Sequence, residues 1–356
     1  MIVEKLYLTN FRNYEKECIE FCDGINVIYG DNAQGKTNLV EALYYLSIGK
    51  SFKVAKDKDI IKFGTEIGSM KAVVRRLIGK IDIEIVLNQN KKQIKVNGGN
   101  LTKVGDLLGT LVTVFFSPND LKLVKEAPND RRKFLDIGIS QLSKRYFTLL
   151  CKYQNILEQR NKLLKNKQDL STIASEIDIW DRYLCQVAKN IIIQRMRYVN
   201  ILSEKANNIH KFITNDKEEL KLSYQTICEK EEDIEKALYN KLKSDYERDL
   251  NLGYTQSGPH KDDIKIYLNN EDVKMFGSQG QQRTVALSLK FAEKEILKEK
   301  IGEYPIMILD DVFSELDDSR NNKIMQLLRK GQTFITTTKK CSTGKQIKIS
   351  AGKVEK

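Results

Sequence analysis

The amino-acid sequence predicts an α/β domain that is interrupted by an inserted, mostly helical lobe. Strand and helix patterns alternate in residues 1–118 and again from residue 253 onward. Between these parts, residues 131–252 contain no proline and only one glycine, which favours long helices. We therefore expect the first part of the domain at 1–118, the helical lobe at 119–252 and the second part of the domain at 253–356.

The first part should begin with a strand, because apolar and polar residues alternate near the N-terminus. A short apolar run at 24–30 leads into a glycine-rich loop, and apolar residues at helical spacing follow up to Gly49, a typical helix stop. Residues 70–99 predict antiparallel strands. A further buried strand is expected at 111–118.

Two apolar series in the lobe, over 142–156 and 173–191, repeat at alternating intervals of four and three residues. The polar stretch 165–171 separates them. This spacing with a short break predicts an antiparallel helical hairpin. Because the arms span only a few heptads, we interpret them as two core helices of the lobe rather than as a projecting coiled coil.

The second part of the domain returns to alternating strands and helices. We expect a strand at 264–268 and a long helix at 281–300. A buried strand at 304–311 and another strand at 332–338 should follow.

Composition limits the classes of function. Hydrophobic residues make up 41% of the 356 residues, which is enough for a packed core. The formal net charge is +12, and the basic surplus is densest in residues 119–211, so a polyanionic partner is expected. The six cysteines are scattered and predict reduced thiols rather than a zinc site. The sequence shows neither a signal peptide nor a membrane-length apolar run, so we expect a soluble, cytoplasmic protein that does not contact membranes.

The glycine-rich loop matches the phosphate-binding pattern G-x-x-x-x-G-K-[ST] at every fixed position, and it follows a predicted strand and opens a predicted helix. In such loops, backbone N–H groups and the helix N-terminus hold phosphate oxygens. We expect Lys36 to reach the β- and γ-phosphates of a nucleotide and Thr37 to ligate Mg²⁺. The loop residues are Gly30, Asp31, Asn32, Ala33, Gln34, Gly35, Lys36 and Thr37.

Two acidic residues complete the pattern. Asp310 and Asp311 follow the apolar run 306–309, as the acidic residue of a Walker B motif does. We expect Asp310 to hold Mg²⁺ together with Thr37, and Asp311 to orient or deprotonate the attacking water. Glu315 is the alternative for the second role.

Two tetrapeptides resemble the guanine-nucleotide motifs of GTPases, at 106–109 and 166–169. The first precedes a predicted strand instead of following one, and the second lies in the polar break of the hairpin. We interpret both as chance matches, so the preference for ATP over GTP is an inference. A monomeric P-loop NTPase, either a GTPase or a nucleotide kinase, is the alternative function.

Several segments together resemble the RecF family of bacterial recombination-repair ATPases, which is related to the heads of SMC proteins and more remotely to ABC transporters. These segments are LYLTNFRNYE, GDNAQGKTN, FFSPNDLKLVKEAPNDRRKFLD, GYTQSGPHKDD, FGSQGQQRT and ILDDVFSELD, and the resemblance runs in order from about residue 1 to 340. The chain departs from the family at Glu126, where glycine is usual, and at Asn119, where an acid is usual. The resemblance implies an ABC/SMC-type P-loop ATPase head with an inserted, mostly helical lobe.

The resemblance also implies site residues. Ser278, Gly280 and Gln281 match a signature loop that caps the γ-phosphate bound by the other subunit of a dimer, although Gln279 replaces a glycine. The other implied nucleotide contacts are Arg12 and Asn13 in an N-terminal turn, Asn38 after the phosphate loop, and Asp317, the acidic member of the D-loop. Thr336, Thr337 and Thr338 stand where transporters carry a switch histidine.

The implied function is ATP-dependent binding of double-stranded DNA and of junctions between single- and double-stranded DNA. The implied protein is an ATP-dependent homodimer and a weak, DNA-dependent ATPase that works with RecO and RecR to help load RecA at single-strand gaps. A structural tether of SMC type would need far longer coiled arms. Our candidate contacts to DNA phosphates are Lys122, Lys125, Arg131, Arg132, Lys144 and Arg145. For His210 and His260 we expect structural roles.

Overall fold

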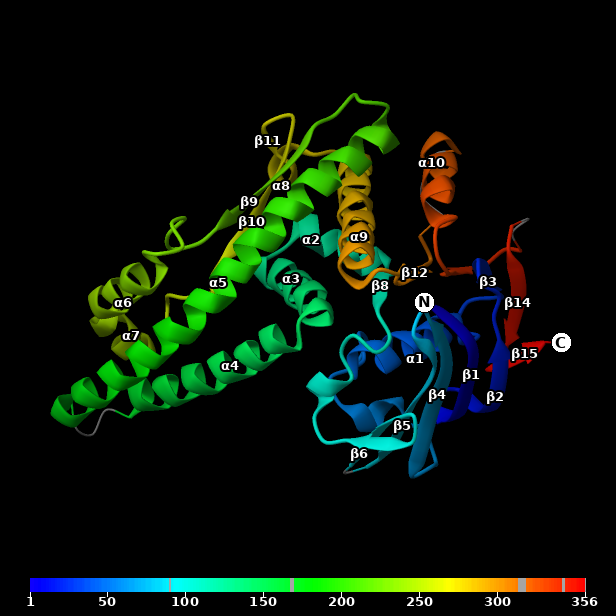
Figure 1. Cartoon of the computed structure of the whole chain (residues 1–356), viewed down its shortest axis with the longest axis horizontal. Coiled ribbons are helices and arrows are strands. Elements are labelled where there is room, and N and C mark those ends of the chain that lie inside the picture. The colour runs from blue at the N-terminus through cyan, green and yellow to red at the C-terminus, as the bar shows by residue number, and fades with distance from the viewer. Residues whose placement is uncertain (90, 167–169, 313–317, 341–342, 356) are drawn as a thin grey trace. The chain divides into compact units, whose positions relative to one another are not determined.

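The structure, a computed structural model, describes residues 1–89, 91–166, 170–312, 318–340 and 343–355 (Figure 1). The chain divides into two compact units, which we describe separately. The first unit, here called the head, comprises residues 1–121, 205–219 and 278–356. The second unit, here called the lobe, comprises residues 122–204 and 220–277.

The head contains two six-stranded sheets. The first is antiparallel and has the order β2 (Tyr14–Glu20), β1 (Ile2–Phe11), β4 (Ile67–Arg76), β5 (Gly79–Asn88), β6 (Lys92–Val96) and β7 (Gly99–Leu101). The second has the order β15 (Lys353–Glu355), β14 (Lys345–Ser350), β3 (Ile25–Tyr29), β13 (Thr333–Thr337), β12 (Ile306–Asp310) and β8 (Thr113–Phe116), and only β15 pairs antiparallel. The predicted strands at 70–99, 111–118, 304–311 and 332–338 are confirmed.

Helix α1 (Lys36–Ile48) packs against strands of both sheets, including β4 and β13. Ten of its thirteen residues are buried, because strands of both sheets pack against it. It ends at Gly49, whose φ of 75° is left-handed and whose N–H donates to the Tyr45 carbonyl. The predicted helix stop is therefore confirmed, and α1 forms the centre of the head.

Helix α9 (Gln279–Ile301) is also largely buried in the head, and it contacts β8. The other helical elements of the head are α10 (Asp318–Leu328), the last turns of α5 (Leu170–Thr214), and the 3₁₀ turns at Asp57–Ile60, Val104–Asp106 and Pro118–Leu121. In β12, every residue is buried, as the sequence predicts for this strand. Its carboxyl end delivers Asp310 to the edge of the sheet that also receives the end of β3.

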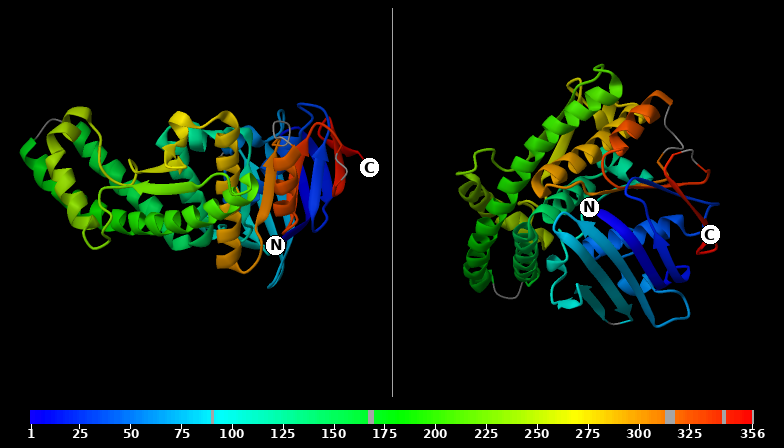
Figure 2. Two further views of the ribbon diagram at one scale, coloured as in Figure 1. Left: turned by 90° about the horizontal axis from the view of Figure 1, so that it is seen from above. Right: turned by 45° about the vertical axis from the view of Figure 1, so that its right-hand side comes forward.

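In the lobe, α4 (Lys144–Lys165) and α5 form the predicted helical hairpin (Figures 1 and 2). The expected seam is buried at Tyr153, Ile156 and Leu184. Near the end of the hairpin, Leu164 and Ile177 pack with residues of α7. The remaining elements are α2 (Lys122–Lys125), α3 (Pro128–Leu142), α6 (Ile234–Ser244), α7 (Tyr246–Leu252), α8 (Val273–Phe276), and the three-stranded sheet of β9 (Leu220–Gln225), β10 (Asp263–Leu268) and β11 (Glu271–Asp272).

A buried ionic cluster joins α4, α5 and α7. The Arg160 guanidinium is fully buried and donates to Asp181 at 2.6 Å and to Asp249 at 2.7 Å. It also donates to the Thr255 hydroxyl at 2.8 Å. Burial raises the pKa of both aspartates, whereas Arg160 acts in the opposite direction. Removal of one partner from such a cluster leaves uncompensated buried charge. We therefore infer that Arg160 stabilises the packing of α4, α5 and α7 in the lobe.

The units differ from the domain ranges expected from the sequence. Residues 253–277, including β10, belong to the lobe and not to the second part of the head. Conversely, residues 205–219 lie in the head although they were expected in the lobe. The strand at 264–268 is confirmed, but it pairs with β9 of the lobe. Local patterns identify an element without identifying the sheet that it joins.

Among the residues that the structure describes, no helix has the length and apolar character required to cross a membrane. Cys18, Cys22, Cys151, Cys185 and Cys228 are free thiols, and Cys341 lies outside the described residues. In the described part of the chain, histidine, cysteine and acidic side chains form no group of three that would suit a metal ion.

Candidate nucleotide-binding site

The phosphate loop, residues 30–35, connects β3 to α1 in a conformation that requires its two fixed glycines. Gly30 has a φ of 150°, and a Cβ atom there would lie 2.3 Å from the Ile349 carbonyl oxygen. Gly35 has a φ of 116°, and a Cβ atom there would lie 2.6 Å from the amide nitrogen of Asn13. Any larger residue at either position would collide and be strained.

Side chains just after β1 donate hydrogen bonds to the backbone of the phosphate loop. The Tyr14 hydroxyl donates to the Gly35 carbonyl at 3.0 Å. The Asn13 amide donates to the Gln34 carbonyl at 2.9 Å, and the Asn38 amide donates to the Asn13 side-chain oxygen at 2.9 Å. These bonds fix the backbone shape of the loop and connect the predicted N-terminal turn to it.

Lys36 lies inside the loop. Its ammonium group donates to the carbonyls of Gly30 at 2.6 Å and Asp31 at 2.7 Å. Burial lowers the pKa of Lys36, and the nearby carboxylates of Asp311, Asp31 and Asp310 act in the opposite direction. A partly desolvated ammonium that is held among backbone groups is suited to pairing with phosphate oxygens.

Asp310 contacts the first turn of α1, the helix that follows the phosphate loop. Its Oδ1 atom accepts hydrogen bonds from the hydroxyls of Thr37 at 3.1 Å and Thr336 at 2.6 Å. Burial raises the pKa of Asp310, while these two hydrogen bonds lower it. A carboxylate and a hydroxyl oxygen at this separation match the hard oxygen ligands that Mg²⁺ prefers, so Asp310 and Thr37 fit the ion.

Asp311 faces solvent beside Asp310. Its backbone has a φ of 54°, which is unusual for a non-glycine residue, and its N–H donates to the Thr336 hydroxyl at 3.0 Å. Asp311 is one of the residues that line the pocket at the phosphate loop. Thr336 therefore fixes both acidic residues, a role that adds to the one expected from its position near the end of β13.

The pocket at the phosphate loop has a volume of about 170 Å³. Its lining residues are Asn32, Ala33, Gly35, Lys36, Thr37, Asn38, Lys53, Asp311, Thr336 and Thr338. The structure thus brings together the loop, Asp311 and the end of β13. Arg12 and Asn13 are not part of the lining.

Lys53 is a second lysine in the pocket, and the sequence reasoning missed it. Its ammonium donates to the Asn38 side-chain oxygen at 2.9 Å. Burial lowers its pKa, whereas Glu41 and Asp310 act in the opposite direction. The neighbouring Phe52 ring stacks on Phe115 at 4.1 Å, which anchors the segment after α1. No short motif marks Lys53, because only this tertiary contact brings the segment back to the loop.

Arg12 is held by a buried carboxylate. Its guanidinium donates to both oxygens of Glu41, at 2.9 and 2.6 Å, and to the Asp59 carbonyl at 2.8 Å. Glu41 is fully buried, so this pair anchors the N-terminal turn to α1. The predicted contact of Arg12 with a nucleotide phosphate stays a prediction.

Ser278 is the N-cap of α9, and Gln281 completes a capping box with it. Ser278, Gln279 and Gly280 are exposed. None of them lines the pocket at the phosphate loop of the same chain. Glu315 and Asp317, both predicted near this function, lie outside the described residues.

The family model of the RecF/RecN/SMC N-terminal domain matches residues 2–351. A Clostridium novyi protein named DNA replication and repair protein RecF is 44% identical over 340 residues, which is 95% of this chain and 93% of the relative. The chain belongs to the RecF family.

A second relative and two solved structures support the same family and fold. The Clostridium tetani protein of the same name is 45% identical over 344 residues, with 95% and 93% of the two chains covered. A solved structure described as the recombination mediator protein RecF with ATP has a TM-score of 0.92 at 39% identity and covers 99% of this chain and 96% of its own. An SMC head domain from Pyrococcus furiosus has a TM-score of 0.58 at 17% identity, covers 99% of this chain and 95% of its own, and supports the fold alone. The predicted ABC/SMC-type ATPase head is confirmed.

In this member of the RecF family, the predicted DNA contacts of the lobe differ in exposure. Lys122, Lys125, Lys144 and Arg145 are exposed. Arg131 is buried, and its guanidinium donates to both oxygens of Asp263, at 2.7 and 2.9 Å, and to the carbonyls of Leu123 and Glu126. This burial argues against Arg131 as a DNA contact, because a phosphate would have to displace a bidentate carboxylate.

Arg132 is half-buried and donates to the Asp262 carbonyl at 2.8 Å. The two histidines have the structural roles expected for them. His260 lies 2.7 Å from the Tyr153 hydroxyl and 3.0 Å from the Thr255 carbonyl, and burial lowers its pKa to about 4. His210 contacts Ser288 and Glu218 within the head.

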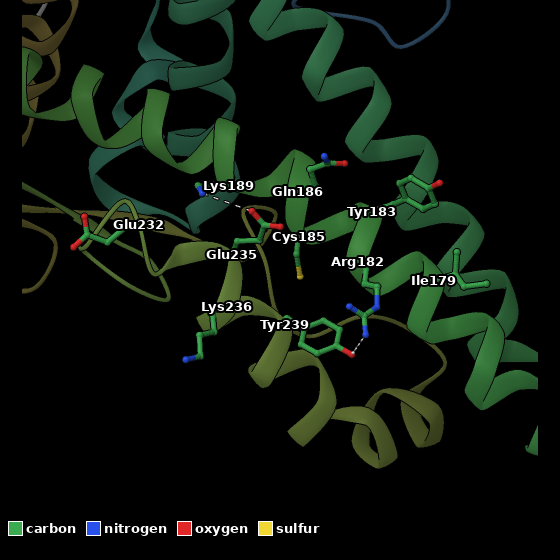
Figure 3. Close-up of a pocket in the computed structure, with 10 residues that line it drawn as sticks. All are labelled: Ile179, Arg182, Tyr183, Cys185, Gln186, Lys189, Glu232, Glu235, Lys236 and Tyr239. Atoms are coloured by element: carbon green, nitrogen blue, oxygen red, sulfur yellow. Dashed lines mark hydrogen bonds and ion pairs between the residues drawn. The ribbon is translucent and has the colours of Figure 1, made fainter.

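A separate pocket of about 700 Å³ lies in the lobe between α5 and α6 (Figure 3). Arg182 and Tyr239 meet across it at 3.2 Å, and Lys189 pairs with Glu235 at 3.6 Å. The exposed Tyr183 adds an apolar surface. Charges of both signs line this pocket, so it lacks the uniformly basic surface of a nucleic-acid groove.

Proposed function

We propose that this chain is an ATP-dependent, double-stranded DNA-binding ATPase of replication and recombinational repair, and that it dimerises when ATP binds. One observation carries the proposal. The phosphate loop, Thr37 and both acidic residues line or border one pocket, whereas the exposed Ser278 turn lies outside that pocket in its own chain. A second chain would supply this turn to the bound γ-phosphate.

Each of these residues has a separate role in ATP hydrolysis. Lys36 exchanges its loop carbonyls for the β- and γ-phosphates, and Thr37 with Asp310 holds Mg²⁺, which neutralises developing charge when it is bound. Asp311 orients the attacking water and accepts its proton. The water oxygen bonds to the γ-phosphorus, the bond from that phosphorus to the bridging oxygen breaks, and ADP and inorganic phosphate leave. Loss of the γ-phosphate removes the ligand that both chains share, so the dimer opens.

The proposed partners follow from charge and from the relatives. The net charge of +12 and the exposed lysines of the lobe favour contacts to DNA phosphates over reading of bases. A solved neighbour is described as a recombination mediator in the RecFOR pathway. We propose that this chain acts with RecO and RecR, and functionally with RecA, at junctions beside single-strand gaps.

Mass in solution tests this function. We expect the mass to double with ATP and Mg²⁺ but not with ADP or without nucleotide, because only ATP presents a γ-phosphate to two chains. Retention of double-stranded DNA on a filter should follow the dimer fraction. Light scattering and filter retention on the same samples measure both quantities. A chain that hydrolyses nucleotide while it stays monomeric would instead favour the alternative, a monomeric P-loop NTPase.

The two acidic residues should respond differently to substitution by asparagine. Asp311→Asn should keep ATP binding and lower turnover by about 100-fold, because the water loses its base while the backbone bend tolerates asparagine. The ATP-bound dimer on DNA should then live longer. Asp310→Asn should raise the Mg²⁺ concentration needed for half-maximal activity, since the ion loses a charged ligand.

Turnover, Mg²⁺ titration and dimer lifetime of both variants check this assignment. Equal hydrolysis by Asp311→Asn and the parent would move the water-orienting role elsewhere, with Glu315 as the next residue to substitute.

A further inference from the structure

The capping box at Ser278 is held from a third residue, Glu218. The Gln281 side-chain oxygen accepts the Ser278 N–H at 2.9 Å, and the Ser278 hydroxyl accepts the Gln281 N–H at 3.3 Å. The other end of the same Gln281 side chain, its amide nitrogen, donates to Glu218 Oε1 at 2.9 Å. Gln281 therefore bridges the turn and Glu218, and its rotamer is fixed from both ends.

Glu218 is itself held in place by α5 and α9. Its Oε2 atom lies 3.0 Å from Nε2 of His210, which is fully buried on the last turns of α5. The Nδ1 atom of His210 lies 3.1 Å from the Ser288 hydroxyl on α9. Burial lowers the pKa of His210, whereas the hydrogen bond and the charge of Glu218 act in the opposite direction. Arg320, from α10, also acts to lower this pKa.

The segment that carries Glu218 is fixed to α10 as well. Lys323 of α10 donates to the Phe212 carbonyl at 2.9 Å and to the Asn215 side-chain oxygen at 2.6 Å. The Lys323 ammonium also lies 4.6 Å from the centre of the Phe212 ring. Residues 212–218 thus contact both α10 and the first turn of α9, all within the head.

We propose that Glu218 is a positioning residue of the ATPase, which sets the Ser278 turn for the γ-phosphate of a second chain through Gln281. This inference rests on the proposed role of Ser278 across the dimer. It adds that the turn depends on the end of α5, because the side-chain amide of Gln281 donates to Glu218 and Glu218 is in turn held by His210 of α5. Helix α5 is continuous from Leu170 to Thr214, and only its residues from 205 onward belong to the head. An event in the lobe that shifts the last turns of α5 would therefore change hydrolysis.

Glu218→Ala tests the contact. We expect kcat to fall about tenfold, the effect of one hydrogen bond to a charged group, while the ATP dissociation constant of the monomer is unchanged. Glu218→Gln keeps an acceptor for Gln281, and His210 can change its tautomer to accept from the new amide, so kcat should stay within about twofold of the parent. The matched control is Glu219→Ala, which removes the same charge one residue away, where the carboxylate pairs with Lys211 at 3.9 Å.

A double-mutant cycle separates positioning from a general loss of structure. If Glu218 acts through Gln281, Glu218→Ala and Gln281→Ala together should lower kcat no further than the more severe single variant. ATP binding by the monomer and the thermal midpoint of each variant are measured alongside. Additive losses in the cycle, or equal kcat values for Glu218→Ala and Glu219→Ala, would overturn the proposal.

The variant Ser278→Arg distinguishes this inference from the function on which it rests. If Ser278→Arg is inactive but Glu218→Ala turns over like the parent, only the positioning role fails. Parental turnover in Ser278→Arg would overturn the dimer function and the role of Glu218 with it.

Discussion

Replacing Lys36 with alanine should strongly weaken ATP binding, dimerisation and tight DNA binding together. In the structure the Lys36 ammonium lies within the phosphate loop, where it donates to the carbonyls of Gly30 and Asp31. Loss of two charge-assisted hydrogen bonds should weaken ATP binding on the order of 100-fold. Since one bound nucleotide is proposed to join the two chains, dimerisation and DNA binding should be lost over the same range of ATP concentration as ATP binding.

Titration of a fluorescent ATP analogue, light scattering with ATP and filter retention of DNA measure the three losses. The matched control is Lys50→Ala, because Lys50 is exposed just after α1 and does not line the pocket. This control should behave like the parent in all three measurements. ATP-dependent dimerisation of Lys36→Ala at the parental level would refute the shared-nucleotide model.

The parts of the site that the sequence predicts are those that local chemistry determines. The phosphate loop needs glycine where φ is positive and neighbouring atoms leave no room for a Cβ, and both conditions hold at Gly30 and Gly35. A short sequence motif marks both positions. Asp310 is the last residue of a fully buried strand, so its place at the end of the parallel sheet is also predictable from the sequence. The seam of the α4–α5 hairpin was predictable for the same reason.

Other features depend on contacts between distant segments. Lys53 reaches the pocket because Phe52, in the irregular segment after α1, stacks on Phe115 of β8. In the sequence Arg131 is one of several cations in a basic stretch. Its ion pair with Asp263 becomes apparent only in the folded chain. Glu218 is separated by more than 60 residues from Gln281, and neither belongs to a motif that would connect them. Periodicity and spacing report on neighbours along one element, so they contain no information on such pairs.

Ser278→Arg should leave ATP binding by the monomer nearly unchanged and should abolish dimerisation and hydrolysis. No residue of the 278–281 turn lines the pocket at the phosphate loop of its own chain, so that pocket should remain intact. The exposed turn would instead place a bulky guanidinium where the γ-phosphate of the partner must approach. Loss of the N-cap should cost only roughly 1 kcal/mol of stability, too little to unfold the head.

Ser143→Arg is the matched control for this substitution. Ser143 caps α4 and accepts the Tyr146 N–H at 3.2 Å, so the control loses an equivalent cap and gains the same charge in the lobe. Nucleotide titration and ATP-dependent mass are measured for both variants. We expect Ser143→Arg to dimerise like the parent. Retained dimerisation in Ser278→Arg would exclude a role for this turn across the dimer.

A mixture of two inactive variants gives the most direct test of sites shared between chains. In a heterodimer of Ser278→Arg and Lys36→Ala, one composite site combines the intact phosphate loop of the first chain with the intact Ser278 turn of the second. The other composite site carries both lesions. Hydrolysis should therefore reappear in the mixture, at up to about half of the parental rate per heterodimer if one closed site suffices. Because each chain alone lacks a complete site, recovered turnover can arise only from residues that meet across the interface.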